Sequence, residues 1–198
     1  MCQRRFAMLA FLDTEFTDLV IQPRLLSVGL VTGNGIGGDR EFYAEVTDRD
    51  RIHAASWFAL SAVLPQFGKV PHAACTYAAL GARLATFLGD LTDALDDSDS
   101  VEIAFGYHLD WELVERAITD SGAAQWQSTR RRLTPVNVYS IAGFGAGALA
   151  AETYFKSKAQ ATLARHHALC DARALRVACE AAREGGSNTS RLVTPAAR

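Results

Sequence analysis

An apolar segment that ends in two acids is the feature that most constrains the fold of this chain. Residues 6–12, FAMLAFL, contain no polar side chain, which is typical of a β-strand buried on both faces. Asp13 and Glu15 follow at positions where an unpaired buried carboxylate costs several kcal/mol. Because alternate side chains of a strand share one face, both acids point the same way, and they repel each other unless a cation or a proton lies between them. The segment therefore predicts a buried strand with a charged site at its end.

Hydrophobic patterning along the remaining sequence predicts one α/β domain. Further strands are indicated at 25–32, 41–46 and 101–107, and a short strand that turns into a helix at 136–143. Amphipathic spacing indicates helices at 53–67, 77–91, 110–118 and 164–183. This order predicts a mixed sheet with flanking helices over residues 1–184, and the composition of residues 185–198 predicts a disordered tail.

Two local motifs have simpler explanations than ligand binding. GNGIGG matches the Gly-x-Gly-x-x-Gly dinucleotide fingerprint at Gly33, Gly35 and Gly38, but that fingerprint requires a helix to follow, and REFYAEV follows instead. We expect a hairpin turn there. The acids within residues 93–99 lack the loop glycine and the terminal glutamate of an EF-hand, which favours a solvated linker.

Composition narrows the classes of partner. The net charge of -2 argues against coating of nucleic acid or anionic membrane by bulk electrostatics, and no apolar stretch approaches the roughly 20 residues of a membrane span. The four cysteines are scattered without zinc-site spacing, so we expect a reduced, cytoplasmic chain with no membrane contact. Arg130, Arg131 and Arg132 form the only basic concentration, which either holds a phosphate backbone or is a solvated charge cluster.

Two further acids lie where predicted helices begin. Asp110 follows a predicted strand and opens a helix, a position at which an acid is also an ordinary helix cap. Asp171 lies in a helix whose apolar stripe predicts packing on the sheet, so its position is not explained by helix capping alone. Carboxylate oxygens are hard ligands that suit Mg²⁺ and Mn²⁺, which makes a divalent metal the obvious counter-ion for such acids.

Taken in order, these motifs resemble those of the DEDDh exonucleases of the ribonuclease H-like superfamily. DTE at 13–15 resembles the first motif, HLD ending at Asp110 the second, and HHALCDA beginning at His166 the third, so that the resemblance covers residues 6–183. DTEF, REFYAEV and SWFALSAVLPQF are similar to segments of a small bacterial subgroup of 3′-to-5′ exoribonucleases. The resemblance implies a ribonuclease H-like mixed sheet with flanking helices.

The resemblance also implies a metal site and a general base. It assigns two divalent cations, Mg²⁺ or Mn²⁺, to Asp13, Glu15, Asp110 and Asp171, with His166 as the base. On a continuous helix His167, four residues before Asp171, would share its face, whereas His166 would point about 140° away. His166 is therefore expected to precede the helix, and His167 stays the alternative.

The expected activity is 3′-to-5′ hydrolysis of RNA that releases nucleoside 5′-monophosphates. Phe16 and Trp57 are candidates for stacking on a terminal base, and single-stranded or 3′-overhang ends are the expected substrates. A DNA-directed, proofreading-type exonuclease and a non-catalytic nucleic-acid-binding or accessory protein are the alternatives. The resemblance also suggests a homodimer, because relatives often pair.

Overall fold

The computed structural model of the chain describes residues 8–19, 22–33, 38–138, 144–157 and 163–189. Its strands are β1 Met8–Phe16, β2 Leu25–Thr32, β3 Glu41–Val46, β4 Ala74–Cys75, β5 Val101–Phe105 and β6 Leu133–Asn137. Its α-helices are α1 Arg49–His53, α2 Tyr77–Asp93, α3 His108–Ser121, α4 Trp126–Arg130, α5 Phe144–Lys156 and α6 Ala168–Thr189. A π-helical turn, η1 Ala59–Val63, and a 3₁₀ turn, η2 Leu64–Gln66, lie between α1 and β4.

The strands form one mixed sheet in the order β4-β3-β2-β1-β5-β6. β2 pairs antiparallel with both β1 and β3, whereas β5 pairs parallel with β1 and β6, and β4 pairs parallel with β3. β1 is therefore a central strand. The predicted α/β class, a mixed sheet with flanking helices, is confirmed, and this arrangement is consistent with a ribonuclease H-like fold.

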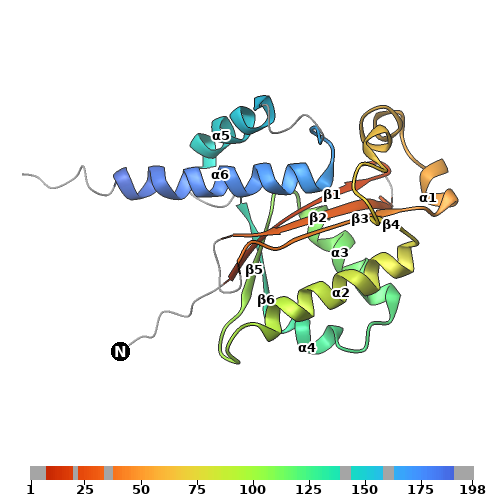
Figure 1. Cartoon of the computed structure of the whole chain (residues 1–198), viewed down its shortest axis with the longest axis horizontal. Helices are drawn as coiled ribbons and strands as arrows, with labels where there is room; N and C mark the ends of the chain where they lie inside the picture. Colours follow the sequence, from red (N-terminus) through yellow and green to blue (C-terminus); the bar gives the residue numbers. More distant parts are fainter. Residues whose placement is uncertain (1–7, 20–21, 34–37, 139–143, 158–162, 190–198) are drawn as a thin grey trace, which may run out of the picture.

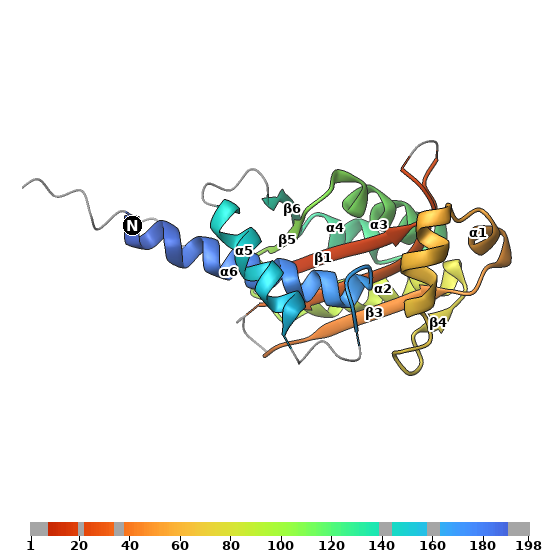
Figure 2. The same cartoon turned by 90° about the horizontal axis from the view of Figure 1, so that it is seen from above.

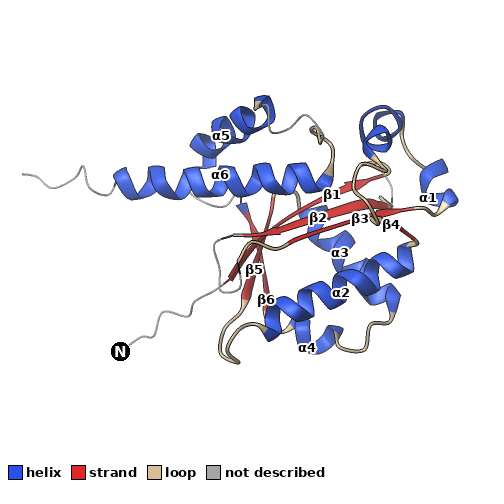
Figure 3. Ribbon diagram, in the orientation of Figure 1, coloured by secondary structure: helices blue, strands red, loops and turns tan. Residues whose placement is uncertain are grey.

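Helices cover both faces of the sheet, as Figures 1 and 3 show, with α5 and α6 on one side and α2, α3 and α4 on the other. Because alternate side chains of β1 point to opposite layers, its residues 8–12 are apolar on both faces. Leu12 packs into the core on the α2 and α3 side, together with Leu84 and Ile118, whereas Phe11 packs on the opposite side with Ala172 of α6. Each layer excludes water from one face of β1, as the sequence predicted for a strand buried on both faces.

The first predicted strand and the first predicted hairpin need adjustment. β1 continues through the acids to Phe16 instead of ending before them, and residues 6–7 lie outside the described residues. β2 and β3 pair antiparallel up to Val31 and Glu41, so the hairpin is present, although Gly35 of its predicted turn is outside the described part of the chain.

The continuous helix predicted at 53–67 is wrong. Helix α1 ends at His53, where the predicted helix was expected to begin. Helical residues resume at 57, and η1 and η2 follow from Ala59. Ser56 instead donates its backbone N–H to Thr17 O at 2.8 Å, which ties the segment to the end of β1. Pro65 falls in η2 and has no N–H to give an α-helix. Figure 2 shows the segment standing beside the end of β1.

Several other boundaries differ from the expectation. α6 begins at Ala168 instead of 164 and continues to Thr189, past the expected domain end at 184, while residues 190–198 are not described. β6 begins at Leu133 and overlaps the strand predicted at 136–143 only at residues 136–137, while residues 139–143 lie outside the described ranges. The short helix α4 was not predicted. Within the described ranges there is no helix of sufficient length and apolarity to cross a membrane.

Candidate metal centre

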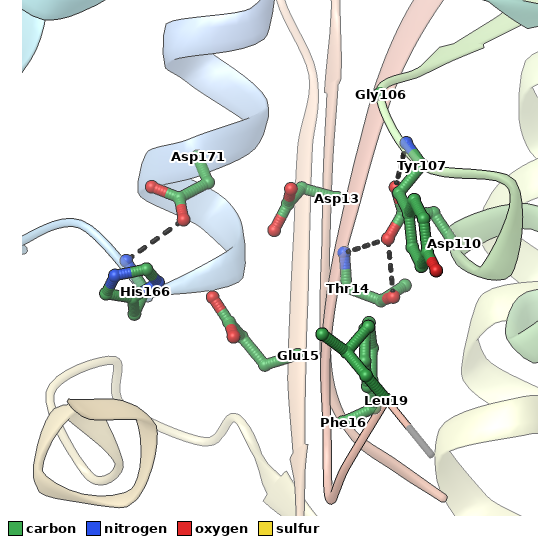
Figure 4. A pocket seen from close by; sticks show the side chains of 10 residues that line it. All are labelled: Asp13, Thr14, Glu15, Phe16, Leu19, Gly106, Tyr107, Asp110, His166 and Asp171. Carbon is green, nitrogen blue, oxygen red and sulfur yellow. Dashed lines mark hydrogen bonds between the residues drawn. The ribbon is translucent and has the colours of Figure 1, made fainter. Parts of the chain in front are cut away.

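The two acids of β1 lie on the face of the strand that α6 covers. Asp13 pairs with Gly29 of β2 and Glu15 pairs with Ser27, so both side chains leave the sheet on the same side. Figure 4 shows their carboxylates on the side of the strand where α6 carries Asp171. Glu15 is 8% exposed, and Asp13 is half-buried.

A glycine in β2 allows α6 to approach the acids. A Cβ on Gly29 would lie 2.4 Å from the backbone carbonyl of Ala168, the first residue of α6, so no larger residue fits without displacing the helix. The start of α6 therefore lies directly on β2, one strand away from Asp13. This contact places Asp171, in the first turn of the helix, opposite the acids of β1.

His166 precedes α6, which is the condition that its predicted role requires. Its backbone has φ 68°, in the left-handed region, and its N–H donates to Asp171 Oδ2 at 2.9 Å. The imidazole meets the edge of the Phe58 ring, with centroids 4.9 Å apart. A left-handed residue at this point interrupts the helical path. His166 therefore does not have the position, about 140° away from Asp171, that a continuous helix would give it.

His167 lies in the core instead. It is 1% exposed, and its ring stacks on Tyr43 of β3 with centroids 4.3 Å apart. Burial lowers its pKa to about 4, so the ring is neutral at neutral pH. His167 is not among the residues that line the pocket around the acids.

Asp110 reaches the same pocket from the opposite layer. Its Oδ1 accepts hydrogen bonds from the Thr14 hydroxyl at 2.8 Å and the Thr14 N–H at 3.3 Å, and its Oδ2 accepts one from Tyr107 N–H at 3.0 Å. Asp110 is thus also the capping residue that the sequence left as an alternative. Thr14 points away from its neighbouring acids, as expected, and its role in holding Asp110 was not predicted.

These side chains line one open pocket of about 450 Å³ (Figure 4). All five residues that the resemblance assigned to metal binding and proton transfer line it, namely Asp13, Glu15, Asp110, His166 and Asp171. The rest of the lining is Thr14, Phe16, Leu19, Gly106 and Tyr107. The acids come from β1, α3 and α6, so segments far apart in the sequence converge at this point.

Three of the residues are close enough to share one ion. One potential ligand atom each from Glu15, His166 and Asp171 lies within 4.8 Å of the others. Asp13 and Asp110 are outside this group of three, although Figure 4 shows Asp13 between Asp171 and Asp110. Asp171 Oδ1 is buried and has no hydrogen-bond partner, as expected of an oxygen available to a cation. The oxygen-rich donor set therefore fits a hard divalent metal.

Burial raises the pKa of every acid in the pocket, and repulsion from neighbouring acids adds to this effect for Asp13, Glu15 and Asp171. Burial, followed by Asp171 and Asp110, raises the pKa of Glu15 to about 9, and the same kinds of cause raise the pKa of Asp13 well above its usual value. Burial raises the pKa of Asp171 to about 7 and that of Asp110 to about 6, against the opposing effect of their hydrogen bonds. Without a cation, the pocket therefore holds protons at neutral pH.

The histidine beside these acids has the opposite shift. Burial and the neighbouring Arg165 lower the pKa of His166 below its ordinary value. The imidazole is accordingly neutral at pH 7 and has a free lone pair.

The two residues predicted to stack on a base have different positions. Phe16 lines the pocket, with its ring 6.4 Å from that of Tyr107, whereas Trp57 is 80% exposed and does not line it. Leu19, which also lines the pocket, and Phe58 were not singled out from the sequence. Phe58 follows Trp57 directly and contacts the His166 ring, so the segment predicted to carry a stacking residue lies beside the pocket, and the stacking role of Trp57 stays a prediction.

The triple arginine has largely structural partners. Arg130 forms an ion pair with Glu115, and Arg132 donates to the backbone carbonyls of Leu95, Asp96 and Asp99. These arginines directly precede β6, which pairs with the start of β5, whereas the pocket lies beyond the end of β5.

No protein-family model matches the chain, and no curated protein sequence matches it.

Proposed function

We propose that this chain is a metal-dependent 3′-to-5′ exonuclease of the DEDDh type that acts on RNA and releases nucleoside 5′-monophosphates. The observation that supports it most is the convergence of Asp13, Glu15, Asp110, Asp171 and His166 on one open pocket. These residues come from three elements that are distant in the sequence. A pocket with four acids and no basic side chain in its lining other than His166 suits a cation that faces an anionic substrate.

In this proposal the acids hold two Mg²⁺ or Mn²⁺ ions. When bound, such a pair of ions would stabilise the attacking and the leaving oxygen of an in-line phosphoryl displacement. Glu15 and Asp171, with the buried free Oδ1 of the latter, supply oxygens on the α6 side. Asp110 supplies the α3 side, and its carboxylate is oriented by the hydrogen bonds from Thr14 and Tyr107.

His166 takes a proton from the attacking water. Its lowered pKa keeps the ring neutral, and its N–H bond to Asp171 holds the residue beside the acids. Its left-handed backbone, which Gln22 and His72 also adopt in this chain, takes His166 off the helical path and leaves its N–H bonded to Asp171.

The 3′ end of a single strand fits the apolar side of the pocket. Phe16 and Tyr107 present aromatic rings beside the acids, and Phe58 contacts His166, so a terminal base has rings on which to stack. We assign Trp57 to the rim, because it is largely exposed. The substrates are short single-stranded or 3′-overhang RNAs, and the site of action is the cytoplasm.

Incubation with 5′-labelled RNA and DNA of identical sequence, each with a 3′ overhang, tests the activity. We expect stepwise 3′ shortening with Mg²⁺ or Mn²⁺, release of nucleoside 5′-monophosphates, and no reaction with EDTA or with Asp13→Ala. Faster shortening of DNA would favour the proofreading type. Binding of either strand without shortening in both metals would favour a non-catalytic nucleic-acid-binding protein and exclude the exonuclease.

The histidine assignment has its own test. We expect His166→Ala to lower kcat by a factor of about 10² or more, the usual contribution of a general base. His167→Phe keeps a ring against Tyr43 and is expected to retain most of the activity. Loss of turnover only in the His167 variant would overturn the assignment, and circular dichroism of both variants excludes unfolding as the cause.

A further inference from the structure

A second pocket contains three arginines and lies at the end of the molecule where β1 ends. Its volume is about 370 Å³, and its charged lining residues are Arg24, Arg51, Arg116 and Asp120. Arg51 belongs to α1 and Arg116 to α3, while Arg24 precedes β2. Figure 1 shows α1 and the start of α2 at the same end of the sheet as the end of β1.

The positive charge of this pocket is only partly neutralised. Arg24 Nη1 lies 3.1 Å from Asp50 Oδ2, but both side chains are largely exposed, so water screens this pair. The guanidinium of Arg51 lies 3.4 Å from the ring centroid of Tyr77. Asp120, the one carboxylate in the lining, accepts the Tyr77 hydroxyl at 3.0 Å.

Arg116 is the least engaged of the three arginines. Its side chain is exposed, and among the described residues it has neither an ion pair nor a hydrogen bond. Arg51 likewise forms no ion pair within the described part of the chain. Two guanidinium groups are therefore available to an anion in a chain whose net charge is -2.

The arginine pocket is fixed to the strand that forms the metal centre. Arg24 N–H donates to Thr17 Oγ1 at 3.1 Å, and Thr17 N–H donates to Arg24 O at 3.0 Å. Thr17 directly follows Phe16, which lines the metal pocket. Because antiparallel neighbours lie about 5 Å apart, the second pocket begins close to the apolar wall of the first.

We propose that this arginine pocket binds the phosphodiester backbone of a single strand whose 3′ end occupies the metal centre. The inference rests on the proposed function and extends it to nucleotides on the 5′ side of the cleaved bond. Guanidinium groups form forked hydrogen bonds with phosphate oxygens, and such contacts position a strand without reading its sequence. The pocket gives this chain of negative net charge a local site that can bind a polyanion. In the sequence, the triple arginine at 130–132 was the candidate for that role.

Arg116→Glu is the variant of choice, and Arg131→Glu is its matched control. Both side chains are exposed and, within the described ranges, form neither an ion pair nor a hydrogen bond, but Arg131 follows α4, near the start of β6 and away from β1's end. Each substitution changes the net charge by the same amount. Arg51→Met is a second test, because it keeps an aliphatic stem against Tyr77 and removes the guanidinium.

Binding is measured by fluorescence anisotropy with a 5′-labelled RNA of about eight nucleotides and with a dinucleotide, a length range based on typical single-strand sites. The Asp13→Asn background with Mg²⁺ prevents degradation of the strand. We expect Arg116→Glu to weaken binding of the longer RNA at least fivefold, as for the loss of one exposed charge pair, and to leave the dinucleotide unchanged. The slope of log Kd against log salt falls by about 0.7 for each phosphate that the variant no longer binds.

Turnover by the otherwise unchanged enzyme separates the two proposals. Arg116→Glu is expected to raise KM for the longer RNA with kcat unchanged, and Arg131→Glu to change neither. Equal effects of the two variants, or an equal effect on RNA of both lengths, would overturn the arginine pocket while the exonuclease stands. Absence of both RNA binding and 3′ shortening in the unaltered chain would overturn the two proposals together.

Discussion

Replacing Glu15 by glutamine tests whether the candidate metal centre is electrostatically strained in the absence of a cation. The glutamine side chain has nearly the same shape but no charge, so its effect reports on the cost of ionising Glu15 beside Asp171 and Asp110. We expect Glu15→Gln to stabilise the metal-free protein at neutral pH. In saturating Mg²⁺ we expect the variant to lose this advantage, because a proposed ligand is missing.

The size of the effect follows from the pKa of Glu15. Burial and the neighbouring acids raise it from 4.5 to about 9, while the unfolded chain keeps the ordinary value. A folded acid with a raised pKa binds its proton more tightly than the unfolded acid does, so stability falls as pH rises from about 4.5 to about 9. At pH 7.5 this penalty is about 4 kcal/mol, and at pH 5 it is under about 1 kcal/mol. Because several acids share the repulsion, about 4 kcal/mol is an upper bound for one substitution.

The assay is urea unfolding of the unaltered protein and of Glu15→Gln at pH 5 and pH 7.5, each in EDTA and in Mg²⁺. Glu112→Gln is the control, since Glu112 is exposed on α3 and outside the pocket. In EDTA the stability advantage of the variant is expected to grow with pH. Mg²⁺ at 100 times its Kd stabilises the unaltered protein by about 2.7 kcal/mol and the variant by less.

An equal stability of Glu15→Gln and the unaltered protein in EDTA at both pH values would refute the electrostatic reasoning. A stabilisation by Mg²⁺ that is the same in the variant and the unaltered protein would instead refute Glu15 as a ligand. The two outcomes are independent, because the first concerns the metal-free pocket and the second the bound ion.

Two other substitutions test how the layers position the acids. Thr14→Val removes the hydroxyl that donates to Asp110 at 2.8 Å. We expect a loss of about 1 to 3 kcal/mol in unfolding free energy, measured by denaturation, and a lower kcat, measured by 3′ shortening. Unchanged values of both would contradict a role for this hydrogen bond. Gly29→Ala places a Cβ 2.4 Å from the Ala168 carbonyl and is expected to destabilise the fold or displace α6. Its control is Gly89→Ala in α2, whose new Cβ has an ordinary contact at 3.8 Å and which is expected to stabilise the fold by up to about 1 kcal/mol. Similar thermal midpoints for the two alanine variants would count against the close approach of α6.

Hydrophobic periodicity predicted the layers of the fold because burial leaves a direct pattern in the sequence. The strand at 25–32 and the start of the helix at 77 are correct, since a strand buried on both faces and an amphipathic helix have different periods. The segment 53–67 was predicted wrongly because the prediction used periodicity alone. Its apolar spacing is helical, but the bond from Ser56 to Thr17 O and the proline in η2 are tertiary and local constraints that periodicity does not contain.

The acids of the candidate site were predicted from motif order, whereas their supports were not. That Asp13 and Glu15 share a face follows from the period of a strand, and the structure places both on the α6 side. The contact between Thr14 and Asp110 joins residues 96 positions apart, and no single-sequence pattern specifies such a distance. The role predicted for His166 requires that the residue precede α6, which its left-handed backbone allows, but no pattern in a single sequence predicts this conformation.

Several features that local rules disfavour occur together at this pocket. His166 has a positive φ, two acids of β1 share a buried face, and Leu19 and Phe58 leave at least half of their surface exposed. Each feature alone has an ordinary explanation, but the positive φ of His166 and the repulsion between the acids both lower the stability of the fold. Such costs persist only where the surrounding structure enforces them, and here the packing of α6 on Gly29 does so on one side. Bound cations would offset the repulsion among the acids, so the metal that the proposed reaction needs is also the agent expected to relieve the strain of the site.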